Sequence, residues 1–310
     1  MRREEVRVRV GGRLLTVSNL TKVLYPETGT MKGDVLSYYQ RIAPLILPHL
    51  RDRPITLKRY PDGVEGLAFF EKRCPHFRPE WVETAPAPSE REGSIDFCLI
   101  NDEAALIWVA NLAALELHPL LSRREDTGRP TMLVFDLDPG PPATLLECCR
   151  VALELRDLLA EFGLASYPKT SGGKGLHFYV PLNTPVTFAQ TKSFARTVAE
   201  LFMRHYPDQA TSIMAKDRRR GKVFIDWSQN DEHKTTICAY SLRARPRPTV
   251  STPVHWDEIA DALRAGDTAS LIFEYDAVLR RIERLGDLLR FASPSRSLVL
   301  HHYTDGLSVA

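Results

Sequence analysis

Cysteine is scarce in this chain, and its spacing suggests no pairing. The 310 residues include five cysteines, an odd number with no CxxC pair: Cys74, Cys98, Cys148, Cys149 and Cys238. Disulfide frameworks and structural zinc sites rest on paired or closely spaced cysteines. The sequence therefore indicates neither kind of site.

Long hydrophobic runs are also missing. No apolar stretch reaches the roughly 20 residues that a membrane-spanning helix needs. The N-terminal stretch MRREEVRVRV carries acidic residues and lacks the apolar core of a secretion signal. We expect a cytoplasmic protein with no membrane partner.

The chain also lacks an excess of charge of either sign. The net charge is +2, so binding to nucleic acid has to be argued from clustering rather than from the total. With 44% apolar and 26% charged residues, the chain can bury a core as one large domain or two lobes. The basic clusters are Arg51, Arg53, Lys58 and Arg59; Lys72 and Arg73; Lys216, Arg218, Arg219, Arg220 and Lys222; and Arg243, Arg245 and Arg247.

The first part of the chain predicts short strands and two helices. Thr30 would cap the first helix and Pro44 would end or kink it, while the second helix would deliver His118 at its C-terminal end. Residues 86–93 are rich in proline and charge, which predicts an exposed loop. The expected strands are 6–10, 14–17, 54–60, 67–71 and 94–100, and the expected helices are 32–43 and 103–117.

The second part has a clearer pattern, in which strands and helices follow the order β-α-β-β-α-β. The strands are expected at 131–137, 164–169, 176–180 and 222–227, the helices at 144–162 and 187–205, and two further helices at 256–265 and 276–290. This order is the split βαβ plan shared by ferredoxin-like and RNA-recognition-like folds. The predicted fold class is α/β (α+β).

The stretch TMLVFDLDPG (131–140) ends an apolar strand with two acids. Asp136 and Asp138 would point to the same face, about 7 Å apart, and a divalent cation between them would relieve their repulsion. Asp226 ends the last strand of the same sheet in FIDW, which would complete a two-metal site with ions about 3.5–4 Å apart. The alternative is a strand end whose acids face solvent.

Two other segments suggest contacts with nucleotides. The glycines of SGGKG (171–175) allow backbone N–H groups to face a phosphate, but the segment is not a Walker A motif, and a tight turn alone would also explain it. Phe69 and Phe70 are adjacent in an expected strand, so one of them must leave the core unless a twist buries both. An exposed pair would form a stacking platform for bases.

Several motifs together resemble the polymerase domain of LigD-type bacterial DNA ligases, in the archaeo-eukaryotic primase superfamily. The resemblance covers about residues 15–290, in order. It implies a single primase-polymerase domain over 1–300, with lobes of about 1–130 and 131–300 and an RNA-recognition-like catalytic half. The motifs are NLTKVLYPETG (19–29), RYPDG (59–63), FFEKR (69–73), ELHP (116–119), FDLDPG (135–140), SGGKGLHFYV (171–180), MAKDRRRGKVFIDWSQN (214–230) and SLRAR (241–245).

The resemblance also implies roles for individual residues. The catalytic metal ligands would be Asp136, Asp138 and Asp226. The groups that bind the incoming nucleotide would be Ser171, Lys174, His177 and Arg243, with Lys58 and His118 nearby. On the DNA side, Lys22 and Lys32 would hold a downstream 5′-phosphate, Phe69 and Phe70 would stack on the template, and Arg219 would help to organise the primer terminus.

By resemblance, the activity is DNA-templated nucleotide addition that fills gaps and extends ends in double-strand-break repair by non-homologous end joining. Ribonucleotides would be preferred, with two Mn²⁺ or Mg²⁺ ions. The partners would be DNA ends, NTP or dNTP, Ku and a separate or fused ligase, and the protein would act at the nucleoid.

These 310 residues contain no KxDG ligase motif and no phosphoesterase module, so the chain is either a free-standing polymerase or an excised domain. The alternatives are a general primase-like polymerase and a DNA end-bridging module without catalysis. A haloacid-dehalogenase-like phosphatase is disfavoured, because Pro139-Gly140 follow the DxD motif and the motif lies deep in the chain.

Overall fold

The computed structural model describes residues 4–290, and the chain within them forms two compact units. The first unit contains residues 4–125, 235–252 and 273–286; the second contains 126–234, 253–272 and 287–290. The predicted extension of the domain to residue 300 lies outside the described residues. Each unit is described by itself.

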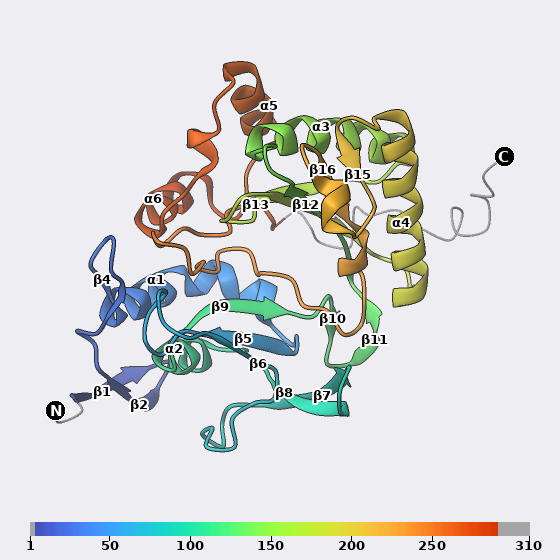
Figure 1. Cartoon of the computed structure of the whole chain (residues 1–310). Helices are drawn as coiled ribbons and strands as arrows, with labels where there is room; N and C mark the ends of the chain where they lie inside the picture. Colours follow the sequence, from blue (N-terminus) through green and yellow to red (C-terminus); the bar gives the residue numbers. More distant parts are fainter. Residues whose placement is uncertain (1–3, 291–310) are drawn as a thin grey trace. The chain divides into compact units, whose positions relative to one another are not determined.

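The second unit is built on a five-stranded sheet with the strand order β13-β14-β12-β16-β15. Its strands are β12 (Met132–Pro139), β13 (Tyr167–Thr170), β14 (Leu176–Pro181), β15 (Ala210–Thr211) and β16 (Val223–Asp226). β12 pairs antiparallel with both β14 and β16. The order β-α-β-β-α-β is confirmed, with β15 as a short addition on the edge (Figure 1).

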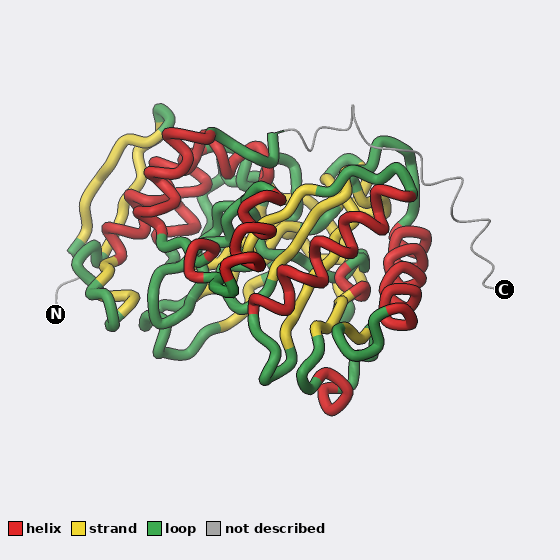
Figure 2. The backbone as a smooth tube through the Cα atoms, turned by 90° about the horizontal axis from the view of Figure 1, so that it is seen from above, coloured by secondary structure: helices red, strands yellow, loops and turns green. Residues whose placement is uncertain are grey.

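Two long helices pack on this sheet, and each begins with a capping box. In α3 (Leu145–Glu161), Thr144 Oγ1 accepts from Leu146 N at 3.2 Å; in α4 (Phe188–His205), Thr187 Oγ1 accepts from Gln190 N at 3.3 Å. Both helices contact β12. Figure 2 shows the course of the backbone from above, with helices in red and strands in yellow. The unit also contains β11 (Asp126–Pro130), α5 (Trp256–Ala265) against α3, and the 3-10 turns η1 (Lys216–Arg219), η2 (Trp227–Gln229) and η3 (Ala269–Leu271).

The first unit contains the strands and helices of the N-terminal part. β5 (Ile55–Arg59) pairs with β6 (Phe69–Glu71), β8 (Gly93–Cys98) and β9 (Ala114–Pro119), and β8 pairs with β7 (Thr84–Ser89). The predicted hairpin of β1 (Glu5–Val10) and β2 (Arg13–Ser18) is confirmed. The other elements are β3 (Val23–Tyr25), β4 (Thr30–Met31), α1 (Lys32–Leu50), α2 (Glu103–Asn111), β10 (Ser122–Arg123) and α6 (Tyr275–Leu285).

The first helix is longer than predicted. α1 runs through Pro44 and Pro48 to Leu50, and it begins after Met31, whose N–H donates to Asp34 at 2.8 Å, rather than after Thr30. Each proline removes one helical hydrogen bond. Ile46 and Leu50 are fully buried, and the burial of such side chains, worth about 1.5–3 kcal/mol each, offsets that loss.

The prediction of a single helix over 103–117 was wrong. α2 ends at Asn111, Ala113 adopts a positive φ of 57°, and the chain continues as β9. Seven consecutive α2 residues are buried, and β9 pairs along the length of β5. Periodicity alone does not distinguish a short buried helix followed by a strand from a single helix. His118 lies on β9 and not at the end of a helix.

Residues 86–93 do not form the exposed loop that their prolines and charges predicted. Pro86 and Pro88 lie within β7, which pairs with β8 and ends the sheet order β6-β5-β8-β7. Edge strands tolerate proline because the missing N–H costs no ladder hydrogen bond on their outer side. Only the tip, between Ser89 and Gly93, turns.

The absence of a disulfide was also predicted wrongly. Cys74 and Cys98 form a disulfide across 24 residues, while Cys148, Cys149 and Cys238 are free and buried. The Cys74 N–H also donates to the carbonyl of Asp96 at 2.7 Å, which holds the two segments together. Spacing in the sequence could not predict this pair because the two segments meet only when β8 enters the sheet.

Across residues 4–290, no helix combines the length and the apolar character needed to span a bilayer.

Candidate active site

A row of polar side chains crosses the middle of the second unit's sheet. Asp136 on β12 lies directly opposite His177 on β14 and directly opposite Asp226 on β16. Residues that face each other across strands point to the same side of a sheet. Phe135 and Leu137 alternate with the acids and are fully buried, so the acids lie on the face opposite to this core.

Asp136 is buried and already has a partner. Its Oδ1 lies 3.1 Å from His177 Nε2, and the other ring nitrogen of His177, Nδ1, lies 3.2 Å from Lys169 Nζ. His177 and Lys169 are both buried. The row therefore extends over four strands, from Lys169 on β13 to Asp226 on β16.

Asp138 is the last residue but one of β12, and its side chain is exposed. Desolvation by the surrounding protein and the negative charge of Asp136 raise its pKa to about 6, although His177 and Arg219 act in the opposite direction. Such a carboxyl binds a proton or a cation readily near neutral pH.

Asp226 is fixed by its own turn. Its Oδ1 accepts from Ser228 N at 3.0 Å and from Ser228 Oγ at 2.5 Å, and its Oδ2 accepts from Gln229 Nε2 at 3.1 Å. No three His, Cys, Asp or Glu side chains among the described residues are grouped as metal ligands. The residue types nevertheless fit a hard divalent cation, since Asp136 faces Asp226 across two neighbouring strands and the charges of Asp136 and Asp226 both raise the pKa of Asp138.

The SGGKG turn packs directly on the acidic strand. Ser171 Oγ accepts from the N–H groups of Gly173 and Gly175, both at 3.1 Å, which stiffens the turn. A Cβ at Gly175 would lie 2.0 Å from the carbonyl oxygen of Leu137, so only glycine allows this approach. Lys174 is exposed at the tip.

The basic loop around Arg219 packs on the other side of the acidic strand. A Cβ at Gly140 would lie 1.9 Å from the carbonyl oxygen of Arg219, and Gly140 N donates to Lys222 O at 2.8 Å. The Arg219 guanidinium lies 3.5 Å from the ring centroid of Phe224, the residue opposite Asp138. Gly140, the last residue of FDLDPG, thus lets this loop approach the acidic strand.

A second polar cluster lies in the first unit, around Glu116. This buried carboxylate lies 2.9 Å from His118 Nε2, 3.3 Å from Arg243 Nε and 3.9 Å from Lys58 Nζ. Its Oε1 also accepts from the N–H of Ala244 at 3.0 Å. The structure thus brings three predicted nucleotide-binding residues together around an acid that the sequence analysis did not name as a site residue.

The charges in this cluster depend on one another. Burial alone would raise the pKa of Glu116, but the hydrogen bond from His118 and the charges of Arg243 and Lys58 lower it to about 2. Burial lowers the pKa of His118, against the opposite effect of Glu116. Glu116 therefore stays ionised at neutral pH, and its charge attracts the cationic groups of Arg243 and Lys58.

Phe69 and Phe70 are both exposed, so neither belongs to the core. The Phe70 ring lies 5.1 Å from Lys58 Nζ and makes an edge contact with His118 at a centroid distance of 5.9 Å. The Phe69 ring lies 5.2 Å from the guanidinium of Arg59. The pair is therefore available for stacking, beside the Glu116 cluster.

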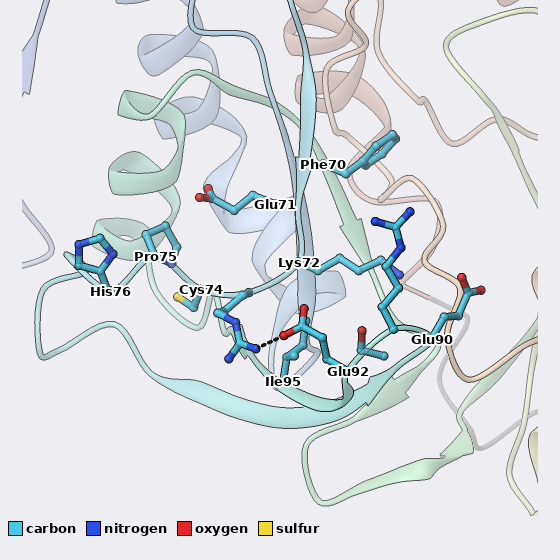
Figure 3. A pocket seen from close by; sticks show the side chains of 12 residues that line it. Phe70, Glu71, Lys72, Cys74, Pro75, His76, Glu90, Glu92 and Ile95 are labelled. Carbon is cyan, nitrogen blue, oxygen red and sulfur yellow. Dashed lines mark hydrogen bonds and ion pairs between the residues drawn. The ribbon is translucent and has the colours of Figure 1, made fainter.

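A pocket of about 640 Å³ begins at Phe70 and continues along the segment after β6 to the β7–β8 turn. Figure 3 shows Lys72 extending from this segment, with Glu90 and Glu92 on the turn. Arg73 is paired with Glu92 at 2.5 Å. The complete lining is Phe70, Glu71, Lys72, Arg73, Cys74, Pro75, His76, Ser89, Glu90, Arg91, Glu92 and Ile95.

Lys22 and Lys32 are brought together by their backbones. The N–H of Lys32 donates to the carbonyl of Lys22 at 2.8 Å across the β3–β4 hairpin, where α1 begins. Their side chains have different surroundings: Lys22 pairs with Asp62 at 2.8 Å, and the buried Lys32 donates to Ser18 O at 2.6 Å.

Three buried residues of these sites escaped the sequence analysis. Glu116 lies within the ELHP motif, two positions before His118, and this strand spacing could have marked it. Asn230 ends the FIDWSQN motif, and its side chain exchanges two 2.8 Å hydrogen bonds with the backbone of Val134. Lys169 lies in no recognised motif, so no signal marked it.

Comparison with known proteins identifies the family of this chain. The family model described as "LigD, primase-polymerase domain" matches residues 31–289. The polymerase domain from Mycobacterium tuberculosis Ligase D, solved in complex with DNA, superposes with a TM-score of 0.84 at 42% identity, over 92% of this chain and 99% of that chain.

Two curated relatives carry names from DNA repair. The multifunctional non-homologous end joining protein LigD of Mycolicibacterium smegmatis is 45% identical over 276 residues, which are 88% of this chain and 35% of the relative. The Mycobacterium tuberculosis non-homologous end joining DNA repair protein LigD is 44% identical over 284 residues, 89% of this chain and 36% of the relative. This chain thus spans about a third of their length, and it belongs to the family of LigD primase-polymerase domains, which are nucleotidyltransferases that act on DNA.

Proposed function

We propose that this chain adds nucleotides, preferentially ribonucleotides, to DNA ends and gaps during the repair of double-strand breaks by non-homologous end joining. The observation that carries the proposal is the register of Asp136 opposite Asp226, with Asp138 at the same end of β12. Three carboxylates from two neighbouring strands would supply the oxygen ligands that metal-assisted nucleotidyl transfer requires.

Polymerase domains of this family generally need divalent metal ions. In our proposal Asp136, Asp138 and Asp226 hold two Mn²⁺ or Mg²⁺ ions. When bound, these ions would lower the pKa of the primer 3′-hydroxyl and neutralise charge on the leaving pyrophosphate. The two fixed strands align the carboxylates before substrate arrives, and this preorganisation favours the transition state.

Each unit, taken by itself, contains candidate partners for phosphate groups. In the second unit, Ser171, Lys174 and His177 line the turn and strand beside the acids, and turn N–H groups suit phosphate oxygens. In the first unit, Lys58, His118 and Arg243 would bind phosphate oxygens, and Glu116 would keep them in place. Charge-assisted hydrogen bonds of this kind are short and strong.

The DNA would contact three further features. Phe69 and Phe70 would stack on template bases, since an aromatic face accepts any base. The template strand would continue into the pocket beyond Phe70, along Lys72. Arg219 would help to organise the primer terminus, held by its contacts with Phe224 and with Met214 O.

End joining rather than general polymerisation is supported by Lys22 and Lys32. The backbone of Lys22 is paired with that of Lys32 at the start of α1, where helix N–H groups also favour an anion. A terminal 5′-phosphate carries more negative charge than an internal diester, so this pair would distinguish a downstream break end. Ku and a ligase would be the protein partners.

The test compares filling of a gap whose downstream strand has a 5′-phosphate with filling of the same gap with a 5′-hydroxyl. We expect faster filling with the phosphate, and faster addition of NTP than of dNTP. Lys22→Ala combined with Lys32→Ala should remove the first difference and leave extension of an open primer-template unchanged; the melting temperature controls for loss of the buried Lys32. Equal rates on both gaps would favour a general primase-like polymerase, and DNA binding without nucleotide addition would favour an end-bridging module.

A further inference from the structure

Lys169 is a fully buried lysine on β13, the first strand in the order of the second unit's sheet. It lies directly opposite His177, and so at the end of the row that continues through Asp136 to Asp226. Burying a lysine is costly, because its ammonium group loses water that only good polar partners replace. The side chain therefore has to serve a function that an apolar residue could not serve.

The backbone of Lys169 does not explain the choice of residue. Its main chain pairs with His177 on β14 and forms a bridge with Pro253, and any strand residue could make these contacts. The side chain reaches two aromatic partners instead. Nζ lies 3.2 Å from His177 Nδ1 and 5.6 Å from the ring centroid of Tyr179, a distance at which an ammonium group is attracted to the ring.

The contact with His177 determines which ring nitrogen carries the proton. When Lys169 is charged, its ammonium group has three N–H donors and no acceptor, and Nδ1 of His177 then accepts from it. In a neutral imidazole the other nitrogen, Nε2, then carries the hydrogen. Nε2 lies 3.1 Å from Asp136 Oδ1, so this tautomer carries its hydrogen on the ring nitrogen nearer the acids.

We propose that Lys169 is a positioning residue that fixes His177 in the Nε2–H tautomer. The inference rests on the proposed function, in which His177 donates toward a nucleotide phosphate beside Asp136. Without Lys169, the ring could carry its hydrogen on Nδ1 or turn about its side-chain bonds, and Nε2 would then offer a lone pair to a carboxylate or phosphate. Partners that orient a functional histidine through its second nitrogen have this general effect.

The first test reads the tautomer directly. The ¹⁵N shifts and proton couplings of ¹⁵N-histidine-labelled protein distinguish Nε2–H from Nδ1–H, and His177→Gln identifies the signal. We expect the Nε2–H form in the unmutated protein, and Lys169→Met should convert it to a mixture or to the Nδ1–H form. An Nδ1–H signal in the unmutated protein, or an unchanged tautomer in Lys169→Met, would overturn the inference; the first of these outcomes does not depend on whether the variant folds.

The second test measures nucleotide addition. Lys169→Met should lower kcat/KM by about 10–100-fold, the usual loss when an orienting partner is removed. Lys169→Arg, which restores an N–H donor, should recover part of it. The matched control is Lys192→Met. Lys192 lies on α4 of the same unit, and its Nζ pairs with Asp231 at 2.6 Å. This variant should keep normal kcat/KM.

A double mutant separates positioning from general destabilisation. If Lys169 acts through His177, then Lys169→Met should cause no further loss of kcat/KM in a His177→Ala background. An equal loss in both backgrounds would refute the positioning role. Full activity of His177→Ala would instead refute the proposed role of His177 in nucleotide addition, while the tautomer measurement would still decide whether Lys169 orients the ring.

Discussion

Replacing Glu116 with glutamine removes the charge that holds Lys58, His118 and Arg243 in place and keeps the shape of the side chain. The pKa of Glu116 is lowered from 4.5 to about 2, chiefly because His118, Arg243 and Lys58 outweigh its burial. At about 1.4 kcal/mol for each pKa unit, this difference is worth about 3 kcal/mol of folding stability at neutral pH. Glu116→Gln should therefore lower the free energy of unfolding by about that amount at pH 7.

The pH dependence gives the sign of the effect. A group whose pKa is lowered on folding stabilises the protein above its unfolded value, here 4.5, and the stabilisation is lost as the pH falls toward 2. Urea unfolding at a series of pH values should show the difference between Glu116→Gln and the unmutated protein shrinking below about pH 4.5. The KM for nucleotide at pH 7 should rise, because Lys58 and Arg243 then repel each other without the intervening carboxylate.

The matched control is Glu92→Gln, which breaks the exposed ion pair with Arg73. Exposed pairs contribute about 0–1 kcal/mol, so this variant should be nearly as stable as the unmutated protein. Equal stability of Glu116→Gln and Glu92→Gln at pH 7 would refute the reasoning, and so would a difference that persists unchanged to pH 3.

Two further predictions concern the surface beside this cluster. Alanine at Phe69 or Phe70 should weaken template binding by about 1–3 kcal/mol with little change in melting temperature, because both rings are exposed; a clear fall in melting temperature with normal template binding would contradict the stacking role. Reduction of the Cys74–Cys98 disulfide should lower stability by about 3 kcal/mol, the expected effect for a loop of 24 residues, which unfolding in urea with and without a reductant would measure; the absence of any change would contradict a stabilising disulfide.

The second unit's architecture could be predicted because its sequence signals are local. The helices of 144–162 and 187–205 begin with threonine caps and end near glycine or histidine, and the observed elements, α3 and α4, differ from them by a residue or less at each end. The strand with FDLDPG has an apolar run and a clear break. What the sequence could not show is that β16 lies directly beside β12, because strand order depends on packing across the whole sheet.

The first unit was harder to predict because its signals conflict. Proline argued against β7, yet the edge of the sheet accommodates it. The apolar residues of 103–117 have no period that separates α2 from β9, and the pairing with β5 decided the outcome. The buried partners of the sites, Glu116 and Lys169, could not be found because their importance lies in contacts between strands.

The most direct test of the account is nucleotide addition by single alanine variants of Asp136, Asp138 and Asp226, on a gapped primer-template with Mn²⁺ or Mg²⁺. Each variant should lose addition while its binding to DNA stays the same or becomes tighter, since each removes negative charge near a polyanion. Asp208→Ala, which removes an exposed carboxylate of the same unit, should remain active. Near-normal addition by any one of the three variants would contradict the three-carboxylate site.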